Sequence, residues 1–169
     1  MSASEPWPVD LLTTEYVISG DIAAPAREWA WAYFQLVGKG PARTLDVEVS
    51  AAAATGARQA PPLAGTLASF GFGTALVAVI PRGPATLAIW EEWNGKAGGV
   101  PAEVLVGPYA LVGSVATPDG TLGTAMLNSV LAVRDATFTR LDGAGAAAPI
   151  AAARAIVATG FVHTGAVAR

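Results

Sequence analysis

The stretch Tyr16-Val-Ile-Ser-Gly-Asp-Ile-Ala-Ala-Pro25 decides the fold, because Tyr109-Ala-Leu-Val-Gly-Ser-Val-Ala-Thr-Pro118 matches it without a gap. Tyr, Gly, one Ala and Pro are identical, and Ile18 matches Leu111 in apolar character. Residues at every second position share one face, which is the pattern of a β-strand. The central Gly predicts a bulge or bend, and the Pro ends the strand because it has no amide hydrogen to donate.

The match continues in the same order along both stretches, which indicates an internal duplication. The further matched residues are Trp29, Ala32 and Phe34 with Leu122, Ala125 and Leu127, then Arg43 with Arg134, then Ala75–Ala78 with Ala155–Ala158. We predict one unit over residues 13–80 and a second unit over residues 104–169.

Each unit is predicted to contain a strand, a short helix, a second strand, a loop and a closing strand. The apolar spacing predicts a helix over 25–37 and a helical turn after Pro118. Alternation predicts strands over 44–49 and 133–141. The closing strands, 75–80 and 155–162, are apolar on both faces and are expected to be central in the sheet. Ala-, Pro- and Gly-rich stretches predict loops over 50–65 and 142–149.

The segments outside the two units are assigned by their turn signals. Residues 1–12 are expected to be an exposed N-terminal arm. Residues 81–103 are expected to hold a hairpin strand over 85–93 and a linker. The predicted fold class is mainly β, α+β with short helices. Two small bent-sheet or partial-barrel units pack about a pseudo-twofold axis, and both units form one compact domain.

Composition excludes several classes of protein. The 169 residues hold 10 Lys and Arg against 13 Asp and Glu, without a basic cluster, which disfavours nucleic-acid binding. There is no cysteine, so neither a disulfide nor a thiolate metal site can form. Residues 60–81 carry no charge over the length of a membrane span, but Pro61, Pro62 and Gly71 favour a loop and a buried strand. The N-terminus lacks a signal pattern, so we expect a cytoplasmic protein with no membrane partner.

A search for catalytic groups finds few candidates. His163 is the only histidine of the chain, and no nucleophile motif accompanies it. Glu91 and Glu92 are adjacent, so on a strand they would point to opposite faces and could not act on one substrate. The sequence therefore predicts no catalytic residue, no metal site and no cofactor.

The candidate binding residues are Trp90, Glu91, Glu92, Trp93 and His163. Trp90 and Trp93 are three apart, so on a strand one would lie in the core and the other would be exposed. An exposed Trp beside acidic residues would form a contact point for a protein or a ligand.

Two functions of different classes follow from these features. The first is a non-enzymatic interaction or assembly module that binds a protein partner or forms a homo-oligomer through a strand edge or apolar face. The alternative is a small-molecule binding protein or carboxylate-based enzyme with a pocket between the two units. The expected lining of that pocket is Tyr16, Trp90, Trp93, Tyr109 and His163.

Overall fold

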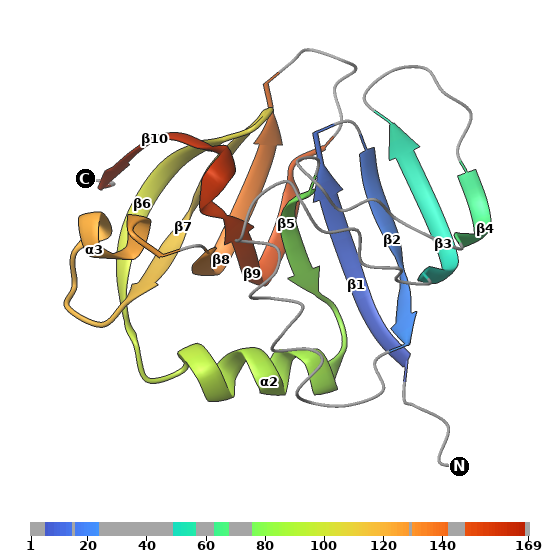
Figure 1. The fold of residues 1–169 in the computed structure, drawn as a ribbon, viewed down its shortest axis with the longest axis horizontal. Helices are drawn as coiled ribbons and strands as arrows, with labels where there is room; N and C mark the ends of the chain where they lie inside the picture. The colour runs from blue at the N-terminus through green and yellow to red at the C-terminus, as the bar shows by residue number, and fades with distance from the viewer. Residues whose placement is uncertain are drawn as a thin grey trace.

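A computed structural model describes the chain in several stretches. The described residues are 6–14, 16–23, 49–56, 63–67, 76–128, 130–141 and 148–167. Within them, ten strands form one antiparallel sheet in the order β10-β6-β7-β8-β9-β5-β1-β2-β3-β4 (Figure 1). The predicted mainly β class is therefore confirmed.

The sheet consists of two consecutive sets of five strands. The N-terminal five are β1 (Pro6–Thr13), β2 (Tyr16–Ala23), β3 (Val49–Gly56), β4 (Leu63–Leu67) and β5 (Leu76–Pro81). The C-terminal five are β6 (Gly98–Val106), β7 (Tyr109–Thr117), β8 (Val130–Arg140), β9 (Ile150–Ala158) and β10 (Val162–Val167). In each set the fifth strand lies beside the first, and the first four follow as a meander.

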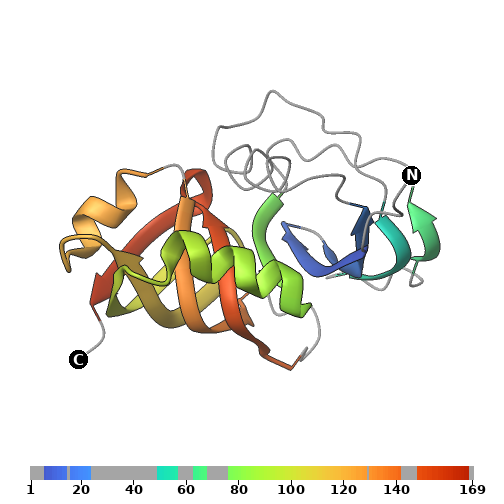
Figure 2. The ribbon, with the colours of Figure 1, turned by 90° about the horizontal axis from the view of Figure 1, so that it is seen from below.

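Two helices and a short turn complete the described elements: α2 (Pro84–Asn94), α3 (Leu122–Met126) and the 3₁₀ turn η1 (Thr159–Phe161). Helix α2 lies below the strands in Figure 1 and in front of β8 and β9 in Figure 2. Helix α3 begins at the N-cap Thr121, whose hydroxyl accepts from the Thr124 N–H.

One apolar core joins the two sets of strands. Leu12 and Val77 from the N-terminal five belong to the same buried cluster as Tyr109, Phe138 and Val157 from the C-terminal five. The rings of Tyr109 and Phe138 meet edge to face, with centroids 6.2 Å apart. The two sets of five strands therefore share this buried cluster.

Several sequence predictions are confirmed by the elements. Strands β2 and β7 both begin at the matched tyrosines, Tyr16 and Tyr109. The strand predicted over 133–141 is observed as β8, which begins three residues earlier and ends one residue earlier. Every residue of β5 is buried, as expected for a central strand. The predicted helix over 25–37 lies outside the described residues, as do residues 44–48 of the predicted strand over 44–49 and most of the loop over 142–149. Val49 is the first residue of β3.

The hairpin strand predicted over 85–93 is wrong, because this segment is helix α2. Pro84 occupies the first turn, where its missing N–H costs no hydrogen bond. Leu87 and Trp90 are three apart, which places them on one side of a helix and lets Trp90 reach the core. The linker is also shorter than predicted, since β6 begins at Gly98.

Two further predictions are corrected in the N-terminal five strands. Residues 6–13 form β1 rather than an exposed arm, because β2 and β5 pair with it on both sides and bury Leu11 and Leu12. The loop predicted over 50–65 contains β3 and β4. Its alanines show no alternation, but pairing with β2 supplies their backbone hydrogen bonds.

The closing strand predicted over 155–162 is also corrected, because it is divided between two strands. Strand β9 ends at Ala158, η1 turns the chain over Thr159–Phe161, and β10 begins at Val162. The chain thereby leaves the centre of the sheet and returns at its far edge, beside β6.

Candidate functional site

Helix α2 carries four of the five predicted binding residues, and the structure separates their roles. Trp90 is fully buried, Glu91 is partly exposed and Glu92 is exposed. The side chain of Trp93 lies outside the described residues. His163 is exposed on the edge strand β10 and takes no part in the hydrogen bonds that join α2 to the sheet. Trp90 is therefore not available at the surface, and His163 lies on a different element from the other four residues.

Trp90 is held in the core by a hydrogen bond and two arginines. Its Nε1 donates to the Ala155 carbonyl of β9 over 3.2 Å. Arg134 and Arg154 are paired across β8 and β9, and their guanidinium groups lie 5.3 and 5.2 Å from the centre of the indole ring. Both cations face the indole π-system, an arrangement that stabilises the ring in place.

The two arginines also connect the sheet to the polar side of α2. Arg154 donates to the Glu91 carboxylate, and Arg134 donates to the Asn94 carbonyl over 2.7 Å. Asn94 is the last residue of α2, so Arg134 places a cation at the negative end of the helix dipole. We interpret Trp90 and Glu91 as structural residues that fasten α2 to the sheet.

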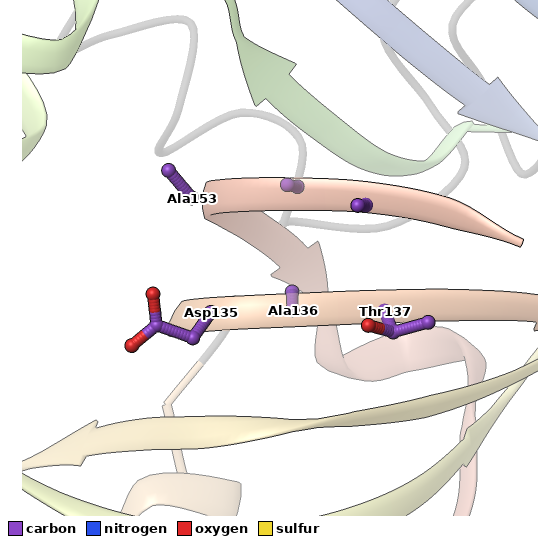
Figure 3. Close-up of a pocket in the computed structure, with 6 residues that line it drawn as sticks. Asp135, Ala136, Thr137 and Ala153 are labelled. Carbon is purple, nitrogen blue, oxygen red and sulfur yellow. The ribbon is translucent and has the colours of Figure 1, made fainter.

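A shallow depression of about 310 Å³ lies over β8 and β9 (Figure 3). Its lining residues are Asp135, Ala136, Thr137, Ala151, Ala152 and Ala153. Asp135 has a φ of 48° and is 84% exposed, with its carboxylate 4.0 Å from Nη1 of Arg154. One exposed carboxylate among alanines offers no second group for acid–base catalysis.

A second depression, of about 270 Å³, lies over β6, β7 and the edge strand β10. Five of its lining residues are exposed and form what we call the β10 patch: Glu103, Leu105, Val112, Thr164 and Ala166. They share one face of the sheet, since Glu103 is paired with both Val112 and Ala166, and Leu105 with Thr164. Leu105 is 40% exposed and Val112 is 48% exposed. This is an apolar surface with one charge, suited to contact with another apolar surface.

Sequence reasoning missed the β10 patch because it did not predict β6. The signal was present in Ala102-Glu-Val-Leu-Val106, where Glu103 and Leu105 alternate with buried residues. That alternation indicates a strand, but the identity of the neighbouring strands is needed to show that Leu105 lies near an open edge.

Asp119, in the turn before α3, has several hydrogen-bond partners. Hydrogen bonds from the Thr124 hydroxyl, the Thr121 backbone N–H and the Thr117 hydroxyl lower the pKa of Asp119 well below its ordinary range. Asp119 thereby remains charged and organises the turn before α3. No group of three or more His, Cys, Asp and Glu residues suited to a metal ion occurs among the described residues.

Comparisons with family models, with curated protein sequences and with solved structures give no match. Within the described stretches, no helix combines the length and apolar character needed to cross a bilayer.

Proposed function

We propose that this chain is a non-enzymatic assembly module that binds proteins, including copies of itself, through the edge of its sheet. The observation that carries the proposal is the β10 patch, where Leu105 and Val112 are exposed beside an edge strand. Unpaired N–H and C=O groups on an edge strand can hydrogen-bond to another strand. Adjacent exposed apolar side chains add a hydrophobic driving force for association.

We further propose that the two sets of five strands are two copies of one unit. The pairing registers support this. Gly20 and Gly113 both interrupt the register between the second and third strands of their sets. The fifth strand of each set has its register shift at its second residue, Val77 in β5 and His163 in β10. Unrelated sheets have no reason to share the strand order and both irregularities.

The relation that we propose between the copies is head to tail. The fifth strand of the first copy, β5, pairs with the fourth strand of the second copy, β9. The pseudo-twofold axis expected from the sequence would instead place the same strand of each copy at the junction. A head-to-tail junction leaves one fifth strand, β10, and one fourth strand, β4, at the ends of the sheet.

Among the residues that the structure describes, no observation favours the alternative function, a ligand pocket between the units. The junction is filled by side chains: Leu76–Ile80 and Ala155–Ala158 are buried. The Tyr109 hydroxyl, one of the expected lining groups, donates to the Thr13 carbonyl over 3.0 Å. Described ionisable groups near the junction are paired, as Arg82 is with Asp10. The cytoplasmic location expected from the sequence remains a prediction.

Light scattering behind size exclusion on the untagged chain tests the assembly function. We expect a defined mass above that of one chain, because the apolar patch and open edges favour association. A single-chain mass across the accessible concentration range would overturn the proposal.

A further inference from the structure

We propose that copies of this chain join head to tail, with β10 of one copy pairing antiparallel with β4 of the next copy. This contact repeats, between molecules, the junction that β5 and β9 form within the chain. The inference rests on the proposed assembly function and specifies which two edges meet. Four observations lead to it: the internal junction, the matched registers, the difference in burial and the position of β4 at the end of the described sheet.

The internal junction shows how the two surfaces fit. Ala78 lies opposite Val157, and Val79 lies opposite Ile156. Polar contacts also cross between the sets: Arg82 donates to the Ala151 carbonyl over 3.0 Å, and Tyr109 donates to Thr13. Val77, Ala78 and Ile80 of β5 belong to the buried cluster that the two sets share.

The matched registers identify the counterpart of each junction residue on the open edge. In β1 and β5, Asp10 is paired with Ile80 and Leu12 with Ala78. In β6 and β10, Glu103 is paired with Ala166 and Leu105 with Thr164. The register shift follows one step further along in both pairs of strands. Glu103, Leu105, Thr164 and Ala166 of the β10 patch therefore correspond to Asp10, Leu12, Ala78 and Ile80.

The corresponding residues differ sharply in exposure. Leu12, Ala78 and Ile80 are 0% exposed and Asp10 is 9% exposed. Every one of their counterparts is exposed, including Leu105 at 40%. On β1 and β5, the face that carries Leu12 and Ile80 is buried at the internal junction. The corresponding face of β6 and β10, which carries Leu105 and Ala166, is exposed. A second copy placed as in the internal junction would cover it.

Strand β4 provides the complementary edge. It is the fourth strand of its set, as β9 is of the other set. Ala53 of β3 is paired with Ala64 of β4, and at the corresponding position Thr137 of β8 is paired with Ala151 of β9. In the same way Val49 is paired with Leu67 as Val133 is with Ala155. Strand β4 is the last strand of the sheet order within the described residues, so its outer side has no strand partner there (Figure 1).

This pairing leads to assemblies larger than two. Strands β4 and β10 are different surfaces, so the contact is heterologous and a pair of copies still has one free edge of each kind. Association therefore continues until the chain of copies closes on itself or grows further. A symmetric dimer, in which two β10 strands meet, would leave no such free β10.

A disulfide between copies tests the direction of pairing, because the native chain has no cysteine. Continuing the junction register by one residue brings Ile80 opposite Ala155, whose counterparts are Ala166 and Leu67. Residues directly opposite in an antiparallel pair have Cα atoms about 4.5 to 5.5 Å apart, within disulfide range. The variants are Ala166→Cys and Leu67→Cys, prepared singly, coexpressed as a mixture and combined in one chain.

We expect each single variant to remain uncrosslinked after mild oxidation, the mixture to give a 1:1 covalent dimer and the double variant to give a ladder of multimers. Intact mass and non-reducing gels measure these products. The control is Ala153→Cys coexpressed with Leu67→Cys, because Ala153 is exposed on β9 away from both edges. Covalent dimers of Ala166→Cys alone, or a mixture no more crosslinked than the control, would overturn the head-to-tail pairing.

A surface substitution tests the β10–β4 pairing separately from the proposed assembly function. Leu105→Lys introduces a charge in the β10 patch and is expected to reduce the mass to that of one chain. Leu127→Lys is the matched control, since Leu127 is 87% exposed at the end of α3. If the native chain is an oligomer and Leu105→Lys leaves its mass unchanged, the pairing is wrong while assembly stands. If the native chain is a monomer, both proposals fail.

Discussion

The strand pair β1–β5 and the strand pair β6–β10 have the same register and different surroundings. In the first pair, β5 also pairs with β9, and Leu12 and Ile80 are fully buried. In the second pair, β10 is the last strand of the sheet order, and the residues at the same register positions, Leu105 and Ala166, are exposed. The two pairs thus share a register and differ in whether a further strand lies beside the fifth strand. The predictions below test this difference, beginning with the largest expected effect.

Trp90→Ala is expected to reduce the free energy of unfolding by about 3 to 5 kcal/mol, the range for deleting a large buried aromatic side chain. Trp90 is fully buried and bonds to Ala155 of β9, which lies at the internal junction. Urea unfolding followed by circular dichroism measures the change. A loss below about 1 kcal/mol would show that α2 does not support the junction.

Leu12→Ala on β1 and Leu105→Ala on β6 compare the two strand pairs directly. We expect Leu12→Ala to cost about 2 to 5 kcal/mol, because it leaves a cavity in the core. Leu105→Ala is expected to cost about 0.5 kcal/mol or less in the single chain, as surface substitutions do. Urea unfolding measures the free energy of unfolding of both variants, at a protein concentration where light scattering gives the mass of a single chain. Equal costs would contradict the difference in burial on which the comparison depends.

Gly113→Ala tests the irregularity shared by β2 and β7. A Cβ at Gly113 would lie 2.7 Å from Cγ1 of Val133 and 3.0 Å from the Arg134 carbonyl oxygen. We expect a loss of about 1 to 3 kcal/mol, as for overpacking in a core. Gly123→Ala is the control, since nothing lies within 4 Å of a Cβ there. If the units are copies, Gly20→Ala has a cost similar to that of Gly113→Ala; thermal unfolding provides the comparison.

Asp119→Asn is expected to have the smallest effect, limited to the turn between β7 and α3. The pKa of Asp119 is lowered in the folded chain, so its ionised form stabilises the fold above the ordinary value of 3.8. That contribution is lost as the pH falls through the lowered pKa. The asparagine variant should therefore unfold earlier than the native chain at neutral pH, with the difference vanishing in strong acid. An Asp119 pKa at or above 3.8 in an NMR titration would refute this account.

Local alternation was sufficient to predict several elements. Tyr16–Ala23 and Tyr109–Thr117 are strands, as the alternation of their apolar residues predicts. Strand β5 is buried throughout, as its apolar residues on both faces predict. The segment 85–93 was assigned to a strand because the turn before it suggested a hairpin. Short apolar segments fit either period, and contact with β9 decides in favour of the helix.

The candidate site was less predictable than the fold. Tryptophan is enriched at interfaces, so the sequence favours Trp90 beside Glu91 as a contact point, but in the structure these two residues contact Arg134 and Arg154. The alanines of β3 have no period, so their pairing with β2 was invisible in the sequence. Exposure of Leu105 depends on residues far along the chain, and no local pattern records it.

The sequence by itself determined the strands with clear alternation, the two matched stretches, the absence of disulfides and the shortage of catalytic groups. These properties depend on composition or on residues within a few positions of one another. Only the tertiary structure decided that β5 pairs with β9, that Trp90 is buried and that β10 lies at an edge. The reason is physical: strand pairing joins residues distant in sequence, so the neighbours of β5 and β10 cannot be read from the residues of either strand alone.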